Sequence, residues 1–304
     1  MLPDYLKVLH FDTESTNLYL IVDGGEAALI DAHVGYEADV VLDAIRKNTS
    51  LNRLRQVILT HWHYDHVGAC PRLYEEYGVI FLAHKMDAPY IENPWQAFLF
   101  LNLYRTPTVS RYNELLRLIG GRGVKIDRLL QDGNAVEVGS VKLRVICSPG
   151  HSHGSICLYD PVERMLFSGD VLTPSEWFQD WLGLVVDARS HWESLQMLDD
   201  LPIELMLRGH VSILDGNDAR TEVVKHIDRF KAIELEIIKT LKDGAPHSLV
   251  EITDEVIEGM IGERSRDVEG LDKATEYITV HSFLQKLCYE GKITQERGNH
   301  WRTL

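Results

Sequence analysis

The sequence predicts a layered α/β fold over the first two thirds of the chain, followed by a smaller helical part. Short apolar runs rich in β-branched residues alternate with segments of helical periodicity up to about residue 215. Beyond about residue 221, long helical patterns replace this alternation. We therefore expect two domains, residues 1–220 and residues 221–304.

Composition narrows the class of protein. The chain has 304 residues, of which 45% are hydrophobic and 25% charged, as in water-soluble globular proteins. Its formal net charge of −15 would repel phosphate backbones, which argues against general nucleic-acid binding. No apolar run is long enough for a membrane helix, and the first residues lack the pattern of a secretory signal. The four cysteines are widely spaced, as expected for free thiols in a cytoplasmic protein.

The first half of the chain predicts strands and helices joined by short connections. Asp23-Gly24-Gly25-Glu26 is a turn signal between two strands, and Gly78 is placed to end a helix. Strand, helix and strand in this order are typical of layered α/β folds. The expected strands are residues 5–9, 17–22, 27–31, 56–60 and 79–83, and the expected helices are residues 36–48 and 65–77.

Residues 86–122 interrupt this order with helical patterns rich in large apolar side chains. Pro94 and Pro107 divide the segment, which we expect to pack as an insertion over one end of the sheet. Two interpretations stay open for its aromatic residues. Either Trp95 and Phe98 line a substrate cleft, or they form a local core.

Strands resume after the insertion. Ser190 and Glu193 have the spacing of a capping box, which predicts a helix over residues 190–200. The expected strands are residues 135–138, 141–146, 155–159, 165–167 and 204–207.

The C-terminal part predicts three helices and a closing pair of strands. Gly244 is placed to end the first helix, and Ser248 with Glu251 forms a second capping-box pattern. Such elements are those of a winged-helix domain. Because this part carries more acidic than basic residues, we expect it to serve packing or dimerisation rather than DNA binding. The third helix is expected near residues 270–288, and the strands near residues 291–294 and 298–301.

The chemistry of the chain centres on residues 61–66, which read His-Trp-His-Tyr-Asp-His and follow the apolar run Val57-Ile58-Leu59. Imidazole nitrogens and carboxylate oxygens are ligands that a divalent ion such as zinc takes. A loop with ligands at positions 61, 63, 65 and 66 can direct them to two ions. A histidine-rich surface turn is the alternative interpretation.

Further residues of the ligand type follow other predicted strands. His151, Asp170 and His210 each lie one to four residues beyond such a strand. Layered α/β folds build their sites on the loops at strand ends, because rigid strands hold those loops in place. We therefore expect these side chains to meet the histidine loop at one edge of the sheets.

Together these residues resemble the signature of the metallo-β-lactamase superfamily. The matching motifs are His-x-His-x-Asp-His at 61–66, Pro-Gly-His at 149–151, Gly-Asp at 169–170 and Gly-His at 209–210. The resemblance implies a four-layer αββα sandwich with two mixed sheets covered by helices. The C-terminal part is similar to the lactamase-β-like 2 and glyoxalase II-like branch, which implies a small winged-helix-like domain after the hydrolase domain.

The resemblance also implies a site for two divalent metal ions. Zinc suits these ligands, and iron or manganese would suit them as well. His153, two residues beyond His151, is the rival for that ligand position. The implied ligands are His61, His63 and His151 for one ion, Asp65, His66 and His210 for the other, and Asp170 between the two.

The implied mechanism is hydrolysis. Two ions would lower the pKa of a bridging water, and the resulting hydroxide would attack the substrate carbonyl. Asp65 would orient this nucleophile and pass its proton to the leaving group, which makes Asp65 the expected catalytic residue. Trp177 and Phe178, shortly after Asp170, either face the substrate or pack locally.

We expect a small-molecule acyl hydrolase that acts on a thioester, an ester or a lactone, with the apolar insertion receiving the acyl group. A phosphodiesterase or endoribonuclease is the first alternative, although the sequence displays no basic groove. A β-lactamase and a non-catalytic metal-binding protein are further alternatives. The expected partner is a small molecule rather than nucleic acid or membrane, and the sequence is compatible with a homo-oligomer.

Overall fold

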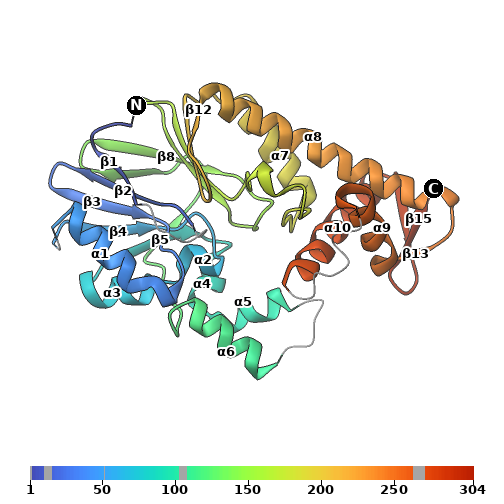
Figure 1. Cartoon of the computed structure of the whole chain (residues 1–304), viewed down its shortest axis with the longest axis horizontal. Helices are drawn as coiled ribbons and strands as arrows, with labels where there is room; N and C mark the ends of the chain where they lie inside the picture. The colour runs from blue at the N-terminus through green and yellow to red at the C-terminus, as the bar shows by residue number, and fades with distance from the viewer. Residues whose placement is uncertain (1, 10–15, 51, 103–107, 263–270) are drawn as a thin grey trace.

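Two six-stranded sheets lie face to face, on the left in Figure 1. The computed structural model describes residues 2–9, 16–50, 52–102, 108–262 and 271–304. Both sheets contain parallel and antiparallel neighbours, as the family resemblance implies. Among the described residues, no helix is both long and apolar enough to cross a membrane.

The first sheet has the order β1-β2-β3-β4-β5-β6. Its first three strands are antiparallel, and β3 to β6 run parallel to one another. Parallel strands place their carboxyl ends at one edge, so the loops after them meet there. The strands are β1 (Leu6–Leu9), β2 (Leu18–Asp23), β3 (Glu26–Ile30), β4 (Leu54–Ile58), β5 (Ile80–His84) and β6 (Arg128–Leu130).

The second sheet has the order β12-β11-β10-β9-β8-β7. Only β10 and β11 are a parallel pair among its described strands. The strands are β7 (Ala135–Val138), β8 (Val141–Cys147), β9 (Ile156–Asp160), β10 (Met165–Gly169), β11 (Leu205–Arg208) and β12 (Leu214–Asp215).

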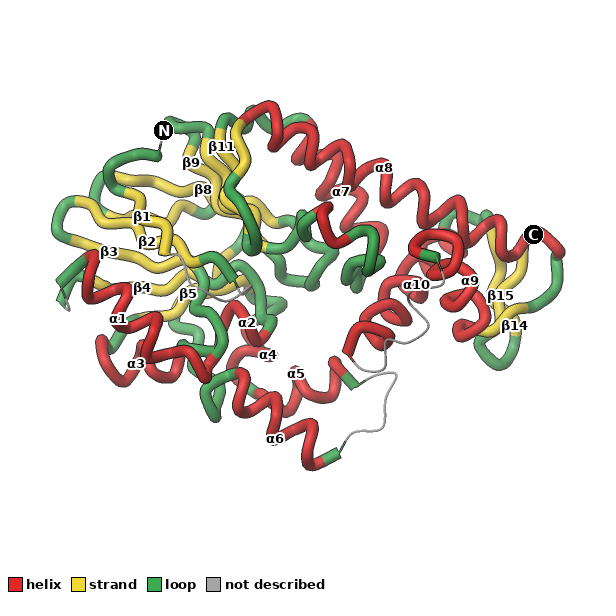
Figure 2. The backbone as a smooth tube through the Cα atoms, viewed as in Figure 1, coloured by secondary structure: helices red, strands yellow, loops and turns green. Residues whose placement is uncertain are grey.

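Helices cover the outer face of each sheet, which gives four layers (Figure 2). One buried hydrophobic cluster lies between the sheets, and one lies under the helices on either side. The αββα sandwich is therefore confirmed. The helices are α1 (Ala38–Asn48), α2 (Tyr64–Val67), α3 (Cys70–Tyr77), α4 (Ala88–Glu92), α5 (Pro94–Leu101) and α6 (Val109–Leu118) beside the first sheet, and α7 (Ala188–Asp199), α8 (Gly216–Thr240), α9 (Leu249–Ile261) and α10 (Leu271–Tyr289) later in the chain.

The structure corrects the predicted helix over residues 65–77, which is divided into α2 and α3. The division falls at Gly68, where a Cβ atom would lie 2.2 Å from the backbone nitrogen of Gly35. Next to it, the backbone nitrogen of Ala69 donates a hydrogen bond of 3.0 Å to the carbonyl oxygen of Ala32 and not to the preceding helical turn, which interrupts the helix. Gly78 ends α3 in the left-handed conformation with a φ of 62°, as predicted.

The predicted capping box at Ser190 is also wrong. Helix α7 starts at Ala188, and its N-cap is Asp187, whose side chain accepts a hydrogen bond from the backbone nitrogen of Ser190. The sequence Asp-x-x-Ser overlaps Ser-x-x-Glu here, and the earlier of two competing caps prevails. The capping box of Ser248 and Glu251 is confirmed at the start of α9. Strands β6, β12 and β13 were absent from the predicted elements.

The C-terminal part contains α8, α9 and α10 together with a small antiparallel sheet of order β13-β15-β14. Its three helices and the closing strand pair follow the prediction, but strand β13 between α8 and α9 was not predicted. A winged-helix character stays a prediction. Helix α8 runs without interruption across the predicted boundary between residues 220 and 221. The division into two domains likewise stays a prediction. The strands are β13 (His247–Ser248), β14 (Ile293–Glu296) and β15 (His300–Thr303).

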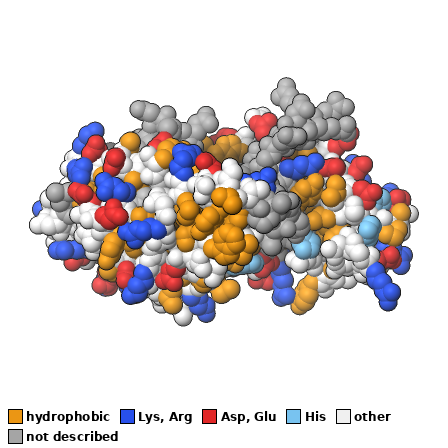
Figure 3. Space-filling view, turned by 90° about the horizontal axis from the view of Figure 1, so that it is seen from below, with side chains coloured by type: hydrophobic (Ala, Val, Ile, Leu, Met, Phe, Trp, Pro, Cys, Tyr) orange, Lys and Arg blue, Asp and Glu red, His pale blue; other side chains and the backbone are white. Residues whose placement is uncertain are grey.

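The predicted insertion over residues 86–122 contains α4, α5 and α6, and its residues 103–107 lie outside the described part of the chain. The face that carries α5 and α6 shows a group of hydrophobic side chains near its centre (Figure 3). On α5, Trp95 and Leu99 are 47% and 45% exposed. The insertion therefore buries one side in the core and presents apolar side chains to solvent on the other.

Candidate metal centre

The predicted ligand residues meet at one edge of the two sheets. The histidine loop follows β4, His151 follows β8, Asp170 follows β10 and His210 follows β11. Three groups of these side chains bring ligand atoms within 4.8 Å of one another. The groups are His61, His63 and His151; His61, His66 and Asp170; and Asp65, His66 and His210.

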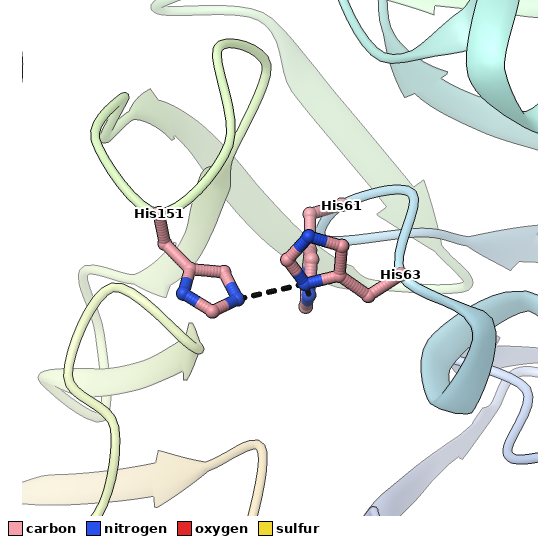
Figure 4. A group of neighbouring side chains, drawn as sticks. All are labelled: His61, His63 and His151. Atoms are coloured by element: carbon pink, nitrogen blue, oxygen red, sulfur yellow. Dashed lines mark hydrogen bonds between the residues drawn. The ribbon is translucent and has the colours of Figure 1, made fainter. Parts of the chain in front are cut away.

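Three imidazoles form one half of this cluster (Figure 4). Nδ1 of His63 lies 3.0 Å from Nε2 of His61 and 2.9 Å from Nε2 of His151. All three side chains are buried, and burial lowers the pKa of each imidazole below its ordinary value. Neutral imidazoles whose nitrogens converge are suited to hold a metal ion.

Carboxylates join the imidazoles in the other half. Oδ2 of Asp65 lies 3.3 Å from Nε2 of His210 and 3.6 Å from Nε2 of His66. Oδ2 of Asp170 is central to both halves, 3.1 Å from His210, 3.4 Å from His66 and 3.6 Å from His151. Asp170 thus has the position that a bridging ligand requires.

The charges of this half stabilise one another. Burial disfavours charge on all of these groups, but the carboxylates outweigh it and raise the pKa of His66 and that of His210, the latter to about 9. Conversely, the neighbouring histidines lower the pKa of Asp65 and Asp170 against the effect of burial. The two aspartates are therefore held as carboxylates, the form that binds cations.

A divalent metal ion fits these residues. Nε2 of His66 and Oδ1 of Asp170 are buried and have no hydrogen-bond partner among the described residues. Buried polar atoms rarely remain without a partner, and His66 and Asp170 both belong to the groups whose ligand atoms converge. Imidazole nitrogens with carboxylate oxygens form the ligand set of zinc and of related divalent ions.

Side-chain and backbone groups around the cluster orient its residues by hydrogen bonding. Oδ2 of Asp31 lies 2.9 Å from Nδ1 of His66, and the carbonyl oxygen of Leu184 lies 3.1 Å from Nδ1 of His151. Thr16 donates a hydrogen bond of 3.2 Å to Asp65. These residues were missed as site residues. Asp31 could have been recognised from the sequence, because it directly follows β3 just as the predicted ligands follow their own strands. Leu184 could not, because it acts through its backbone carbonyl group and its side chain carries no information about that role.

Glycines precede the later ligands for steric reasons. At Gly209 a Cβ atom would lie 2.1 Å from Oδ1 of Asp170, and at Gly150 it would lie 2.4 Å from Cβ of His191. Gly150 also has a φ of 145°, which side-chain-bearing residues rarely adopt. The Gly-His pairs of the sequence therefore let two loops pass close to the cluster.

A cleft of about 600 Å³ opens beside the cluster. Trp177 is one of its walls, with its ring centroid 5.1 Å from that of His210. The prediction that Trp177 faces the substrate is compatible with this position. The cleft is lined by His63, Tyr64, Asp65, Leu101, His151, Asp170, Thr173, Trp177, Asp180, Trp181, Leu184, His210 and Thr275.

The other predicted substrate residues lie elsewhere, and their positions favour the packing interpretation. Phe98 is 2% exposed within the core of the first layer, and Trp95 packs on it with ring centroids 5.3 Å apart. Phe178 packs against His226 at 4.9 Å and under the guanidinium of Arg229. His153, the rival of His151, is exposed and belongs to none of the three ligand groups among the described residues.

A buried ion-pair network supports the loop that carries His210. The guanidinium of Arg208 is fully buried and lies 3.1 Å from Glu222 on α8 and 3.2 Å from Glu176. It also donates to the backbone oxygen and the hydroxyl of Ser212. Because Glu176 precedes Trp177, Arg208 connects the His210 loop with a wall of the cleft.

Comparison with known proteins agrees with this geometry. The family model "Metallo-beta-lactamase superfamily" matches residues 12–210. A "Beta-lactamase-like protein 2 homolog" of Caenorhabditis elegans is 24% identical over 285 residues, which cover 93% of this chain and 82% of the relative. The human "Acyl-coenzyme A thioesterase MBLAC2" is 28% identical over 208 residues, covering 64% of this chain and 72% of the relative.

A solved structure supports the fold over the full length. The crystal structure of a metallo-beta-lactamase family protein from Thermus thermophilus has a TM-score of 0.77 at 19% identity and covers 100% of both chains. The chain belongs to the metallo-β-lactamase superfamily, and it is a hydrolase of that superfamily. The predicted resemblance is thereby confirmed.

Proposed function

We propose that this chain is a dinuclear metal-dependent hydrolase of small-molecule acyl substrates, with thioesters preferred over esters and lactones. The observation that carries the proposal is the convergence of His61, His63, His66, His151 and His210 with Asp65 and Asp170 beside a cleft of about 600 Å³. The name of the human relative supports thioesters as the substrate class.

The residues divide into two metal sites. His61, His63 and His151 would hold one ion, Asp65, His66 and His210 the other, and Asp170 would contact both. When bound, the ions supply Lewis acidity that polarises a carbonyl group and acidifies water. Zinc is the proposed metal because imidazole and carboxylate ligands suit it.

Asp65 is proposed as the catalytic residue. Its side chain is 21% exposed and lines the cleft, whereas the side chain of Asp170 is only 8% exposed. Thr16 and His210 hold the Asp65 carboxylate by hydrogen bonding and ion pairing. From there an oxygen of Asp65 can accept the proton of the attacking water and return it to the leaving thiolate or alkoxide.

The walls of the cleft suit an acyl substrate. Leu101, Leu184, Trp177 and Trp181 provide apolar surface close to the cluster. Asp180 is the one charged side chain among the described lining residues outside the histidine–aspartate cluster. A scissile phosphate would meet this carboxylate without a lysine or arginine from the described lining, which disfavours the phosphodiesterase alternative.

Metal analysis and a substrate panel test the proposal. We expect about two metal ions per chain and turnover of acyl thioesters, which Asp65→Ala abolishes. Asp39→Ala is the control, because Asp39 is an exposed carboxylate on α1 that pairs with Arg72. Two bound ions with turnover of phosphodiesters but not of acyl substrates would contradict the proposed substrate. Less than about one ion after reloading with zinc would contradict the site.

A further inference from the structure

We propose that α10 is part of the active site: a row of hydroxyl groups on this C-terminal helix holds the loop of residues 181–186, and this loop positions both His151 and the cleft wall Trp181. The row consists of Thr275, Thr279 and Ser282. The inference deepens the proposed hydrolase function and rests on it. The three residues are positioning residues, since they act through the loop.

The spacing of the row places it on one face of α10. Residues four and seven positions apart stack along the same side of an α-helix. The hydroxyl of Thr279 accepts a hydrogen bond of 3.0 Å from the backbone nitrogen of Val185 and donates one of 2.7 Å to the carbonyl oxygen of Gly183. The hydroxyl of Ser282 lies 2.8 Å from the carbonyl oxygen of Val185. Thr279 and Ser282 are buried, so water does not compete for these bonds.

The loop in turn holds the His151 segment at two points. The carbonyl oxygen of Leu184, between the two residues that Thr279 binds, lies 3.1 Å from Nδ1 of His151. The backbone nitrogen of Val186 donates a hydrogen bond of 2.7 Å to the carbonyl oxygen of Gly150. A carbonyl that accepts from Nδ1 fixes the tautomer and the ring orientation, which leaves Nε2 free to face the other ligands.

Thr275, the first residue of the row, holds the cleft wall Trp181 by a hydrogen bond. The indole nitrogen of Trp181 donates a hydrogen bond of 3.0 Å to Oγ1 of Thr275. Both residues line the cleft, together with Leu101 from α5. Figure 1 shows α10 passing from the C-terminal sheet toward α5. A segment more than ninety residues away in the chain therefore closes one side of the cleft.

An adjacent, apolar side of α10 anchors the helix that carries the row. Val280, Phe283, Leu284 and Leu287 are fully buried in the hydrophobic cluster that also contains residues of α7, α8 and α9. Because α10 is anchored in this way, the helix does not shift when a hydrogen bond between its hydroxyl row and the loop is removed. The loop itself must then relax, and His151 moves with it.

Three valine variants test the inference, because valine replaces threonine with little change in shape. Thr279→Val should weaken metal binding about tenfold or more, the effect typical of lost outer-sphere support, as measured by competition with a chelator. Thr275→Val should leave metal affinity unchanged and raise KM more than it lowers kcat. The control is Thr253→Val on α9, whose buried hydroxyl has no described partner and which should change neither quantity.

The outcomes separate this inference from the proposed function. Chelator competition needs no substrate, so a wild type without turnover would refute the function while Thr279→Val still tests the positioning role. Thr279→Ser, which restores the hydroxyl, should recover metal affinity. Metal affinity of Thr279→Val within twofold of the control would overturn the inference, even if its thermal stability fell.

Discussion

The carboxylate of Asp31 lies 2.9 Å from Nδ1 of His66 and accepts further hydrogen bonds from the backbone nitrogen and hydroxyl of Thr60. Asp31 has a φ of 61°, in the left-handed region that aspartate and asparagine tolerate better than most residues. The end of β3 thus presents one carboxylate to His66, a proposed metal ligand.

Replacing this carboxylate should weaken metal binding. We expect Asp31→Asn to keep the backbone conformation and to lower metal affinity about 10- to 100-fold, because the amide is a weaker partner for the imidazole. Chelator competition measures the effect. Asp160→Asn is the matched control, since Asp160 is also buried but binds Tyr5 at the end of β9 away from the cluster. Equal affinities of the two variants would show that Asp31 has no such role.

His151 and His153 form a natural pair for testing the ligand assignment. His151 is 3% exposed and faces His63, whereas His153 is exposed. We expect His151→Ala to lose about one of two ions and His153→Ala to lose none, as read by metal analysis after gel filtration. Loss of metal in the His153 variant alone would reverse the assignment.

The buried guanidinium of Arg208 should matter for stability. Arg208→Met leaves the carboxylate of Glu222, 4% exposed, without its buried cation and with only the exposed Lys225 at 3.6 Å, which costs about 3–5 kcal/mol of the free energy of unfolding. The double variant Arg208→Met with Glu222→Leu should recover most of that loss, because no buried charge is left unpaired. Urea unfolding of the two single variants and the double variant measures the coupling. Additive losses would contradict this explanation.

His191 should make the protein less stable in acid. Burial, reinforced by the charges of His226 and His151, lowers the pKa of His191 to about 3 from an ordinary value of 6.5. Between these values the unfolded chain binds a proton that the folded chain does not, so the contribution of this group is complete above pH 6.5 and falls toward pH 3. The slope from this group reaches about 1.4 kcal/mol per pH unit.

The variant His191→Phe isolates this effect. A phenylalanine keeps an aromatic ring beside Phe230, whose ring centroid lies 6.2 Å from that of His191. Urea unfolding over the acid range should show a shallower loss of stability than in the wild type. His153→Phe, a change at an exposed histidine, serves as the control. Parallel stability curves for wild type and His191→Phe would show that His191 does not titrate in this way.

Sequence patterns predicted the fold and assembled the candidate ligands for a simple physical reason. Each ligand follows an apolar run that can only be a buried strand, and strands of one sheet bring their ends to a common edge. His61, Asp170 and His210 could therefore be placed together without any knowledge of distances. Asp31 obeys the same rule but was overlooked, because it was assigned to the expected strand over residues 27–31 and not to the loop after it.

The walls of the cleft could not be predicted in the same way. Helix α5 has apolar residues on every side, so its periodicity does not reveal that Phe98 enters the core while Leu101 faces the cleft. Thr275 carries even less signal, because a hydroxyl on a helix is ordinarily a surface residue. Such contacts between distant segments depend on how the layers dock, which local patterns do not encode.

Helix α8 gives the molecule a mechanical property. Its 25 residues form a rod of about 37 Å that begins shortly after His210 and ends beside the small sheet, where Thr303 donates to the carbonyl oxygen of Leu241. If a rigid helix of that length tilts by about 5° about one end, its other end moves by about 3 Å. A displacement of the small sheet would therefore be transmitted along α8 to the loop that carries His210.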